Sequence, residues 1–88
     1  KALYYHFYEY PAEHAVKKHY GIYDGRYKLI HFYDDIDIWE LYDRATDPKE
    51  MTNLYNNPEY KDIIIKLKQE LKELQIEYND PILEQYPL

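Results

Sequence analysis

Cationic and aromatic side chains gather in one short stretch of the sequence, between residues 13 and 20. The residues that form this group are Glu13, His14, Lys17, Lys18, His19 and Tyr20. Lysine and histidine donate charge-assisted hydrogen bonds to anionic groups, and aromatic rings pack against the apolar faces of sugars. This combination predicts a site for a sulfated or carboxylated sugar. The alternative is an ordinary surface loop.

The other reactive residue types do not assemble into a catalytic or metal centre. His6 and His31 fall in segments expected to be strands, and His14 and His19 lack the H-E-x-x-H spacing of a zinc site. The acidic run 34–37 lacks the glycine and closing glutamate of an EF-hand loop. The chain has no serine, no cysteine and 2 glycines, which excludes serine and thiol nucleophiles and a glycine-rich phosphate loop. We therefore expect no catalytic residue and no metal site, with the histidines held by local hydrogen bonds.

Length and composition narrow the class of protein. The chain has 88 residues, which suits one small domain, and it has no apolar run long enough to span a membrane. Its net charge of −6 with scattered lysines argues against nucleic acid as a partner. Tyrosine is abundant, with 13 residues against 2 phenylalanines. Because tyrosine suits half-buried surfaces and interfaces, we expect some of these rings to face a part of the protein, or a partner, outside this chain.

Four segments have the composition of β-strands, and one turn between them is well marked. Asp24-Gly25 is a dipeptide that supplies the positive φ angles of a tight hairpin turn. Ile38 to Tyr42 alternates so that Trp39 and Leu41 share one sheet face. The expected strands, which form an antiparallel meander, are Leu3–Tyr10, His19–Tyr23, Arg26–Tyr33 and Ile38–Tyr42.

The second half of the chain predicts a loop and one long helix. Asn57-Pro58 marks a helix start, with Asn as the cap and Pro in the first turn. An apolar stripe follows at spacings of three and four, formed by Tyr60, Ile64, Leu67, Leu71, Leu74 and Tyr78. The predicted fold is α+β, a four-stranded antiparallel sheet with the C-terminal helix packed on one face. As a single domain 1–88 it divides into the sheet (1–43), a loop (44–57), the helix (58–79) and a tail (80–88). The other sheet face is then an aromatic docking surface.

Several phrases of the sequence resemble one enzyme family. Residues 8–22, YEYPAEHAVKKHYGI, and 26–30, RYKLI, are similar to the C-terminal region of type I sulfatases. WELYD at 39–43, DPKE at 47–50 and NLY at 53–55 resemble the segment that follows in that region, and 58–74 resembles its terminal helix. The resemblance spans nearly the whole chain, and it points to bacterial sulfatases of the N-sulfoglucosamine sulfohydrolase and iduronate sulfatase kind.

The resemblance implies a parent enzyme much larger than this chain. Such an enzyme has a large α/β catalytic domain with a formylglycine and a calcium ion. It hydrolyses sulfate esters or sulfamates, often on glycosaminoglycans, and is periplasmic or secreted. The C-x-P-S-R motif that yields formylglycine and the calcium-binding aspartates are absent from this sequence, so no catalytic residue is carried over. The chain begins with Lys1 rather than methionine, which fits a fragment that packs against the catalytic domain and borders its substrate pocket.

The resemblance also sharpens the sugar-site prediction. It implies that His19, in the H-Y-G phrase, contacts the sulfated carbohydrate together with His14 and Lys18. One departure is Tyr23, where relatives often have an arginine, and this puts the glycosaminoglycan assignment in question. The expected partners are the catalytic domain of the same polypeptide and a sulfated sugar. The alternative is a free-standing protein-interaction or carbohydrate-binding module that uses its aromatic sheet face.

Overall fold

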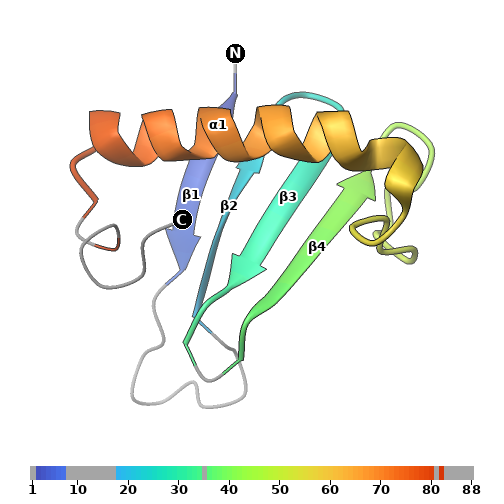
Figure 1. Ribbon diagram of the computed structural model, residues 1–88, viewed down its shortest axis with the longest axis horizontal. Coiled ribbons are helices and arrows are strands. Elements are labelled where there is room, and N and C mark those ends of the chain that lie inside the picture. Colours follow the sequence, from blue (N-terminus) through green and yellow to red (C-terminus); the bar gives the residue numbers. More distant parts are fainter. Residues whose placement is uncertain (1, 8–17, 35, 81, 83–88) are drawn as a thin grey trace.

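The computed structural model describes residues 2–7, 18–34, 36–80 and 82. One antiparallel sheet, in the order β1-β2-β3-β4, carries a helix across one face (Figure 1). The elements are β1 (Leu3–Phe7), β2 (His19–Tyr23), β3 (Tyr27–Phe32), β4 (Ile38–Asp43), the 3₁₀ helix η1 (Pro58–Tyr60) and α1 (Lys61–Glu77). This arrangement confirms the predicted α+β fold. None of the helices formed by these residues is long and apolar enough to cross a membrane.

The predicted boundaries differ from the observed ones at a few points. Residues 8–10, expected to extend the first strand, lie outside the described part of the chain, as does most of the expected tail. The expected helix 58–79 is a 3₁₀ turn followed by an α-helix that ends at Glu77. Asn79 has a φ of 54°, a left-handed conformation that asparagine tolerates and that ends the helix.

The β2–β3 hairpin is closed by Asp24 and Gly25. The Asp24 side chain accepts backbone N–H bonds from Arg26 (2.9 Å) and Tyr27 (2.7 Å). Gly25 has a φ of 103°, which a residue with a side chain rarely adopts. Glycine therefore provides the unusual backbone angle, and the Asp24 carboxylate holds the turn by accepting two backbone N–H groups.

The helix start follows the expected capping pattern. The Asn57 side-chain oxygen accepts the backbone N–H of Glu59 at 3.0 Å, and Pro58 occupies the first position of η1. In the loop before it, Asp47 accepts the backbone N–H groups of Met51 and Thr52, both at 3.0 Å. In this polar segment, side-chain oxygens therefore accept the backbone N–H groups that have no partner in a strand or helix.

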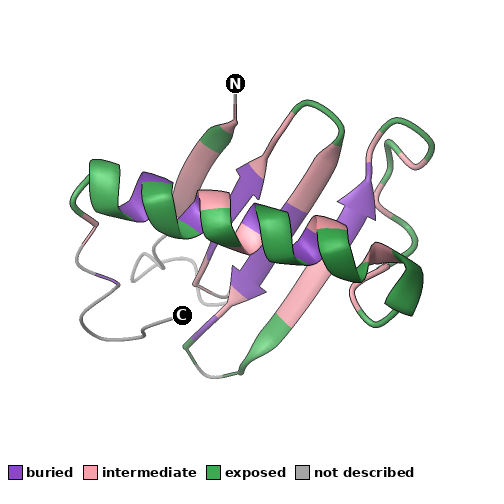
Figure 2. Ribbon diagram, turned by 45° about the horizontal axis from the view of Figure 1, so that its top comes forward, coloured by how far each residue is buried: buried purple, intermediate pink, exposed green. Residues whose placement is uncertain are grey.

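The core lies between α1 and the sheet, as the purple stripe of the helix in Figure 2 shows. The helix contributes a row of buried leucine and isoleucine side chains, and Trp39 and Leu41 lie on the covered sheet face as predicted. Tyrosine is also part of this core, with Tyr20 fully buried and Tyr33 6% exposed. The chain therefore uses some of its tyrosines internally, and the uncovered sheet face carries fewer rings than the composition suggested.

Candidate functional site

The sheet face opposite α1 consists of three rows of residues, each running across all four strands. Strand alternation places these side chains on the side away from the helix, because their sequence neighbours Tyr20 and Ile22 are in the core. The rows are Phe7, His19, Phe32 and Ile38; Tyr5, Gly21, Ile30 and Glu40; and Leu3, Tyr23, Lys28 and Tyr42. We call this surface the open face. Its first row is mainly aromatic, and its charged residues, Glu40 and Lys28, are in the second and third rows.

His19 lies between two phenylalanine rings in the first row. Its imidazole stacks on Phe7, with ring centroids 5.2 Å apart, and its centroid lies 5.0 Å from that of Phe32. Tyr5 meets the same imidazole edge-on at 5.9 Å. The β-register creates this arrangement, since Phe7, His19 and Phe32 are direct cross-strand partners. The ring is half-buried and its orientation is fixed by aromatic contacts on both sides.

Lys18 lies next to His19, at the entrance of β2. Its ammonium group is 3.7 Å from the Asp34 carboxylate, and both side chains are about one-third exposed (36% and 31%). An ion pair at this distance and exposure is weak, so the ammonium group can exchange it for another anion. Of the three expected sugar contacts, the structure brings Lys18 and His19 to the same corner of the sheet, and His14 lies outside the described residues.

Tyr5 packs closely over Gly21 in the middle row. A β-carbon at Gly21 would be 2.7 Å from the Tyr5 hydroxyl oxygen and 2.8 Å from the Leu29 carbonyl oxygen. Burial, with smaller contributions from Glu50 and Glu40, raises the pKa of Tyr5 to about 12, so its hydroxyl stays protonated. A glycine within a strand is the sequence signal that could have predicted this close approach.

The third row and the loop beside it hold a charged cluster that the sequence did not predict. The Glu50 carboxylate accepts Lys28 Nζ at 3.1 Å and lies 3.2 Å from Arg44 Nε. Tyr42 donates its hydroxyl hydrogen to Glu40 at 2.6 Å, and burial together with this carboxylate raises the pKa of Tyr42. The charges in this cluster balance, so the open face is not a uniformly charged surface.

His31 belongs to a chain of hydrogen bonds on the helix side of the sheet that runs from the buried Tyr20 to the exposed Asp37. Its Nε2 is 2.6 Å from the Asp37 carboxylate and its Nδ1 is 2.7 Å from the Tyr20 hydroxyl. Because a carboxylate only accepts, Nε2 of the neutral ring donates to Asp37 and Nδ1 accepts from Tyr20. Burial lowers the pKa of His31, and the hydrogen bond to Asp37 opposes that shift without cancelling it.

His6 occupies a second chain of the same kind. Its Nδ1 is 2.8 Å from the Asp80 carboxylate and its Nε2 is 2.7 Å from the Tyr33 hydroxyl. Burial alone would raise the pKa of Asp80, but hydrogen bonds from Tyr4, Ile82 and His6 hold it below its usual value. The two Asp-His-Tyr chains have the order of a general-base relay, yet Tyr20 and Tyr33 are buried and cannot reach a substrate. His6 and His31 are hydrogen-bonded, as expected, but their partners lie 6 to 74 residues away, so these bonds are not local in sequence.

The structure contains no cluster that could hold a metal within the part of the chain that it describes. In residues 2–7, 18–34, 36–80 and 82, no three histidine, aspartate or glutamate side chains converge as metal ligands require. The His19 corner offers an imidazole and a partly exposed ammonium group, which are donor types that anions and sugar hydroxyls accept from.

Sequence comparison identifies a family that matches most of the chain. A profile of the family described as N-sulphoglucosamine sulphohydrolase, C-terminal, matches residues 1–77. An N-acetylglucosamine-6-O-sulfatase of Bacteroides thetaiotaomicron is 56% identical over 80 residues, which is 91% of this chain and 14% of that protein. Human N-sulphoglucosamine sulphohydrolase is 39% identical over 57 residues, covering 65% of this chain and 11% of that protein. The chain therefore spans about a seventh or less of the length of these relatives.

A solved structure has the same fold over almost the whole chain. It shows a protein in complex with its substrate, D-glucosamine-2-N,6-O-disulfate, and superposes with a TM-score of 0.85 at 56% sequence identity. The match covers 91% of this chain and 16% of that one. At this level of identity, the likeness reflects common descent as well as a common fold.

Proposed function

Because the chain belongs to the N-sulphoglucosamine sulphohydrolase C-terminal family, we propose that it is the C-terminal part of a sulfatase acting on sulfated glycans. The parent enzyme would hydrolyse a sulfate ester or a sulfamate, and this chain would contribute no catalytic residue. The observation that carries the proposal is the family match over residues 1–77, together with relatives that are named sulfatases. Fold alone would not support it, since one fold can serve many functions.

The open face is proposed to pack against the catalytic domain of the same polypeptide. Apolar side chains on this face remain accessible, with Leu3 63% and Ile38 45% exposed. The matched segments are 14% and 11% of the lengths of the two relatives, so most of such a protein lies outside this chain. A half-covered aromatic sheet face is the surface that a larger domain would bury.

The His19 corner is proposed to border the substrate pocket. His19 has its ring held by Phe7 and Phe32, and Lys18 stands next to it with a weak ion pair. A fixed imidazole and an exchangeable ammonium group are suitable donors to a sulfate or a sugar hydroxyl. His14 is proposed as a third contact on the basis of the family resemblance alone.

The chemistry of the proposed hydrolysis would come from groups outside this chain. Formylglycine and calcium are proposed constituents of the catalytic domain, and this chain has no cysteine or serine from which a formylglycine could form. A periplasmic or secreted location is proposed from the same family likeness. The contribution of this chain would be to complete the wall of the pocket and to orient an anionic sugar.

The test of the His19 role uses the full-length protein that contains this chain. His19→Phe keeps the aromatic stack but removes both ring nitrogens, whereas His19→Ala also removes the ring. A lost charge-assisted hydrogen bond costs about 1.5–3 kcal/mol, so kcat/KM for a sulfated glucosamine should fall roughly 10- to 100-fold in both variants. Turnover of a small chromogenic sulfate ester, which has no sugar to orient, should change much less.

Lys66→Gln provides the control, because Lys66 is an exposed lysine of α1, away from the open face. It should leave kcat/KM unchanged. If His19→Phe has wild-type kcat/KM and an unchanged melting temperature, His19 does not contact the substrate. The 88-residue chain alone should not turn over the chromogenic ester, and measurable turnover by pure material would contradict its noncatalytic role.

A further inference from the structure

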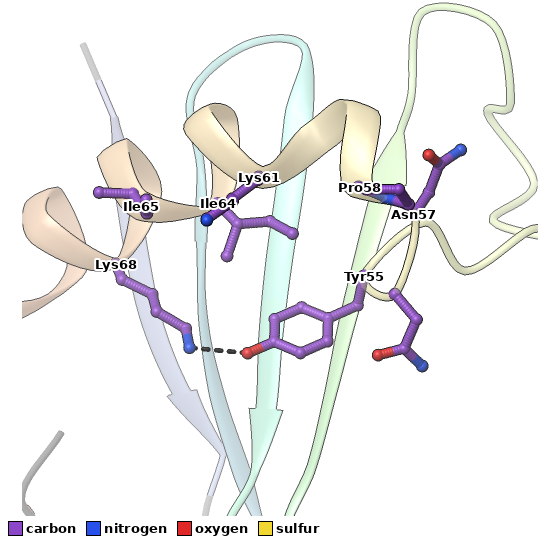
Figure 3. Close-up of a pocket in the computed structure, with 8 residues that line it drawn as sticks. Tyr55, Asn57, Pro58, Lys61, Ile64, Ile65 and Lys68 are labelled. Atoms are coloured by element: carbon purple, nitrogen blue, oxygen red, sulfur yellow. Dashed lines mark hydrogen bonds between the residues drawn. The ribbon is translucent and has the colours of Figure 1, made fainter.

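A cavity of about 350 Å³ lies between the start of α1 and the loop that precedes it (Figure 3). Pro58, Ile64 and Ile65 give it apolar walls, and Lys61 and Lys68 line it from the same face of α1, about two helical turns apart. Small-molecule sites have volumes of roughly 300–1,000 Å³, so this cavity is large enough for one sugar ring. It is on the helix side of the sheet, whereas His19 is on the open face.

The aromatic wall of the cavity is held in place by a stack of rings. Tyr55 stacks on Trp39, with centroids 5.9 Å apart and planes 12° apart, and Trp39 stacks on His31 at 3.9 Å. Lys68 Nζ donates to the Tyr55 hydroxyl at 2.7 Å, as the dashed line in Figure 3 shows, and lies 4.3 Å from the centroid of Trp39. Both the ring and the ammonium group are therefore pre-positioned, which lowers the ordering cost of binding.

The charge of the cavity has one sign. Its lining includes two lysines and no carboxylate, and the amides of Asn56 and Asn57 complete the rim. Glu59 and Asp62 are close in sequence, but both are exposed and neither lines the cavity. An anion is the complement of this set of groups.

We propose that this cavity is a second carbohydrate site, which binds a sugar ring carrying a carboxylate or a sulfate. The C–H face of the ring packs on Tyr55 and Ile64, and the anionic group is held by Lys61 and Lys68. The inference rests on the proposed function in two respects: the substrate is a sulfated glycan, and docking of the open face leaves the helix side accessible. The site would then hold another residue of the same glycan class.

The test is a titration of the full-length protein with three sugars of the same size. Glucuronic acid carries a carboxylate, glucose 6-sulfate carries a sulfate, and glucose carries neither. With ¹⁵N-labelled asparagine and lysine, the backbone amide signals of Asn56, Asn57 and Lys61 report on the rim and the helix start. We expect saturable shifts with the first two sugars and none with glucose. Comparison of the two acidic sugars shows which anion the site prefers.

Two double variants distinguish binding by the lysines of the cavity from a general effect of the positive charge of the helix. Lys61→Gln with Lys68→Gln removes both lining cations, whereas Lys66→Gln with Lys72→Gln makes the same charge change on residues that do not line the cavity. The dissociation constant should rise at least about tenfold in the first pair, since a charge-assisted hydrogen bond is worth about 1.5–3 kcal/mol. It should change less than about twofold in the second pair, where only screened long-range charge is lost.

The outcomes decide the proposal and separate it from the sulfatase assignment. Shifts that are absent, that glucose produces equally, or that both double variants weaken equally would overturn the second site. A melting temperature measured on each variant excludes loss of fold. If Lys68→Gln destabilises the protein, Tyr55→Phe is the second variant, because it keeps the aromatic wall and removes the hydroxyl to which Lys68 donates. Turnover of the chromogenic ester is measured separately, so a protein that binds without turnover retains this site and loses the proposed function.

Discussion

His31 is surrounded by groups that keep its imidazole neutral and fixed. Trp39 covers one face of the ring at 3.9 Å, and hydrogen bonds to Tyr20 and Asp37 occupy both nitrogens. Burial is the largest influence on its pKa and lowers it; the Lys68 ammonium group acts in the same direction. Burial also raises the pKa of Tyr20 to about 12, so that hydroxyl remains a donor. The neutral ring therefore accepts one hydrogen bond and donates the other.

This arrangement predicts a stability that depends on pH. A histidine with a lowered folded-state pKa stabilises the fold above its unfolded pKa of about 6.5, and that contribution is lost as pH falls through the folded value. Relative to His31→Gln, the wild-type chain should lose free energy of unfolding below about pH 6.5, by at most about 1.4 kcal/mol per pH unit. Urea denaturation at pH 5 to 8 measures the difference between the two chains.

The variant itself is the control, since every other titrating group is common to both chains. NMR titration of the His31 ring gives an independent reading, and its pKa should lie below 6.5. A difference in unfolding free energy that is flat with pH, or a His31 pKa above the ordinary value, would contradict this account.

At the scale of elements, sequence periodicity was sufficient to predict the sheet, the helix and the faces with which they pack. Trp39 and Leu41 alternate onto the covered face, and the stripe through Leu67 and Leu71 meets them in the core. The hydrogen-bond partners could not be read in the same way. Asp80 bonds His6 although 74 residues separate them, and no local pattern encodes such a distance. The second carbohydrate site likewise needs the fold, because Tyr55 and Lys68 meet only once the loop packs on the helix.

The helix stripe leads to a prediction about stability. Leu71→Ala removes a side chain with no exposed surface, so it should lower the free energy of unfolding of the chain by about 2–5 kcal/mol. Ile76→Ala is the control on the same helix, at a residue 60% exposed, and should change it by less than about 0.5 kcal/mol. Urea denaturation followed by circular dichroism measures both. Equal effects would mean that this helix face is not held against the sheet.

At the scale of the whole molecule, the two faces of the sheet differ in how they are covered. One is closed by α1 within the chain, and the other leaves Leu3 and Ile38 exposed, although Ile30 and Tyr42 on the same face are buried. Of the exposed apolar residues of the open face, Ile38 belongs to the aromatic row that holds His19, whereas Leu3 is in the third row. Docking of this face and orientation of His19 are therefore expected to be coupled, because the same rows serve both.

The open face should make the isolated chain self-associate, and one charge placed on it should reverse this. Ile38→Lys introduces an ammonium group into the first row at a residue 45% exposed, where it is tolerated in the monomer but is costly to bury in an interface. Sedimentation velocity should show concentration-dependent association of the wild-type chain and a monomeric Ile38→Lys variant. Ile76→Lys makes the same change on the helix side and should associate like the wild type. A wild-type chain that stays monomeric at all concentrations would instead indicate that the open face needs no cover.

In the full-length protein, Ile38→Lys should lower the melting temperature more than Ile76→Lys does, since only the first would weaken packing on the catalytic domain.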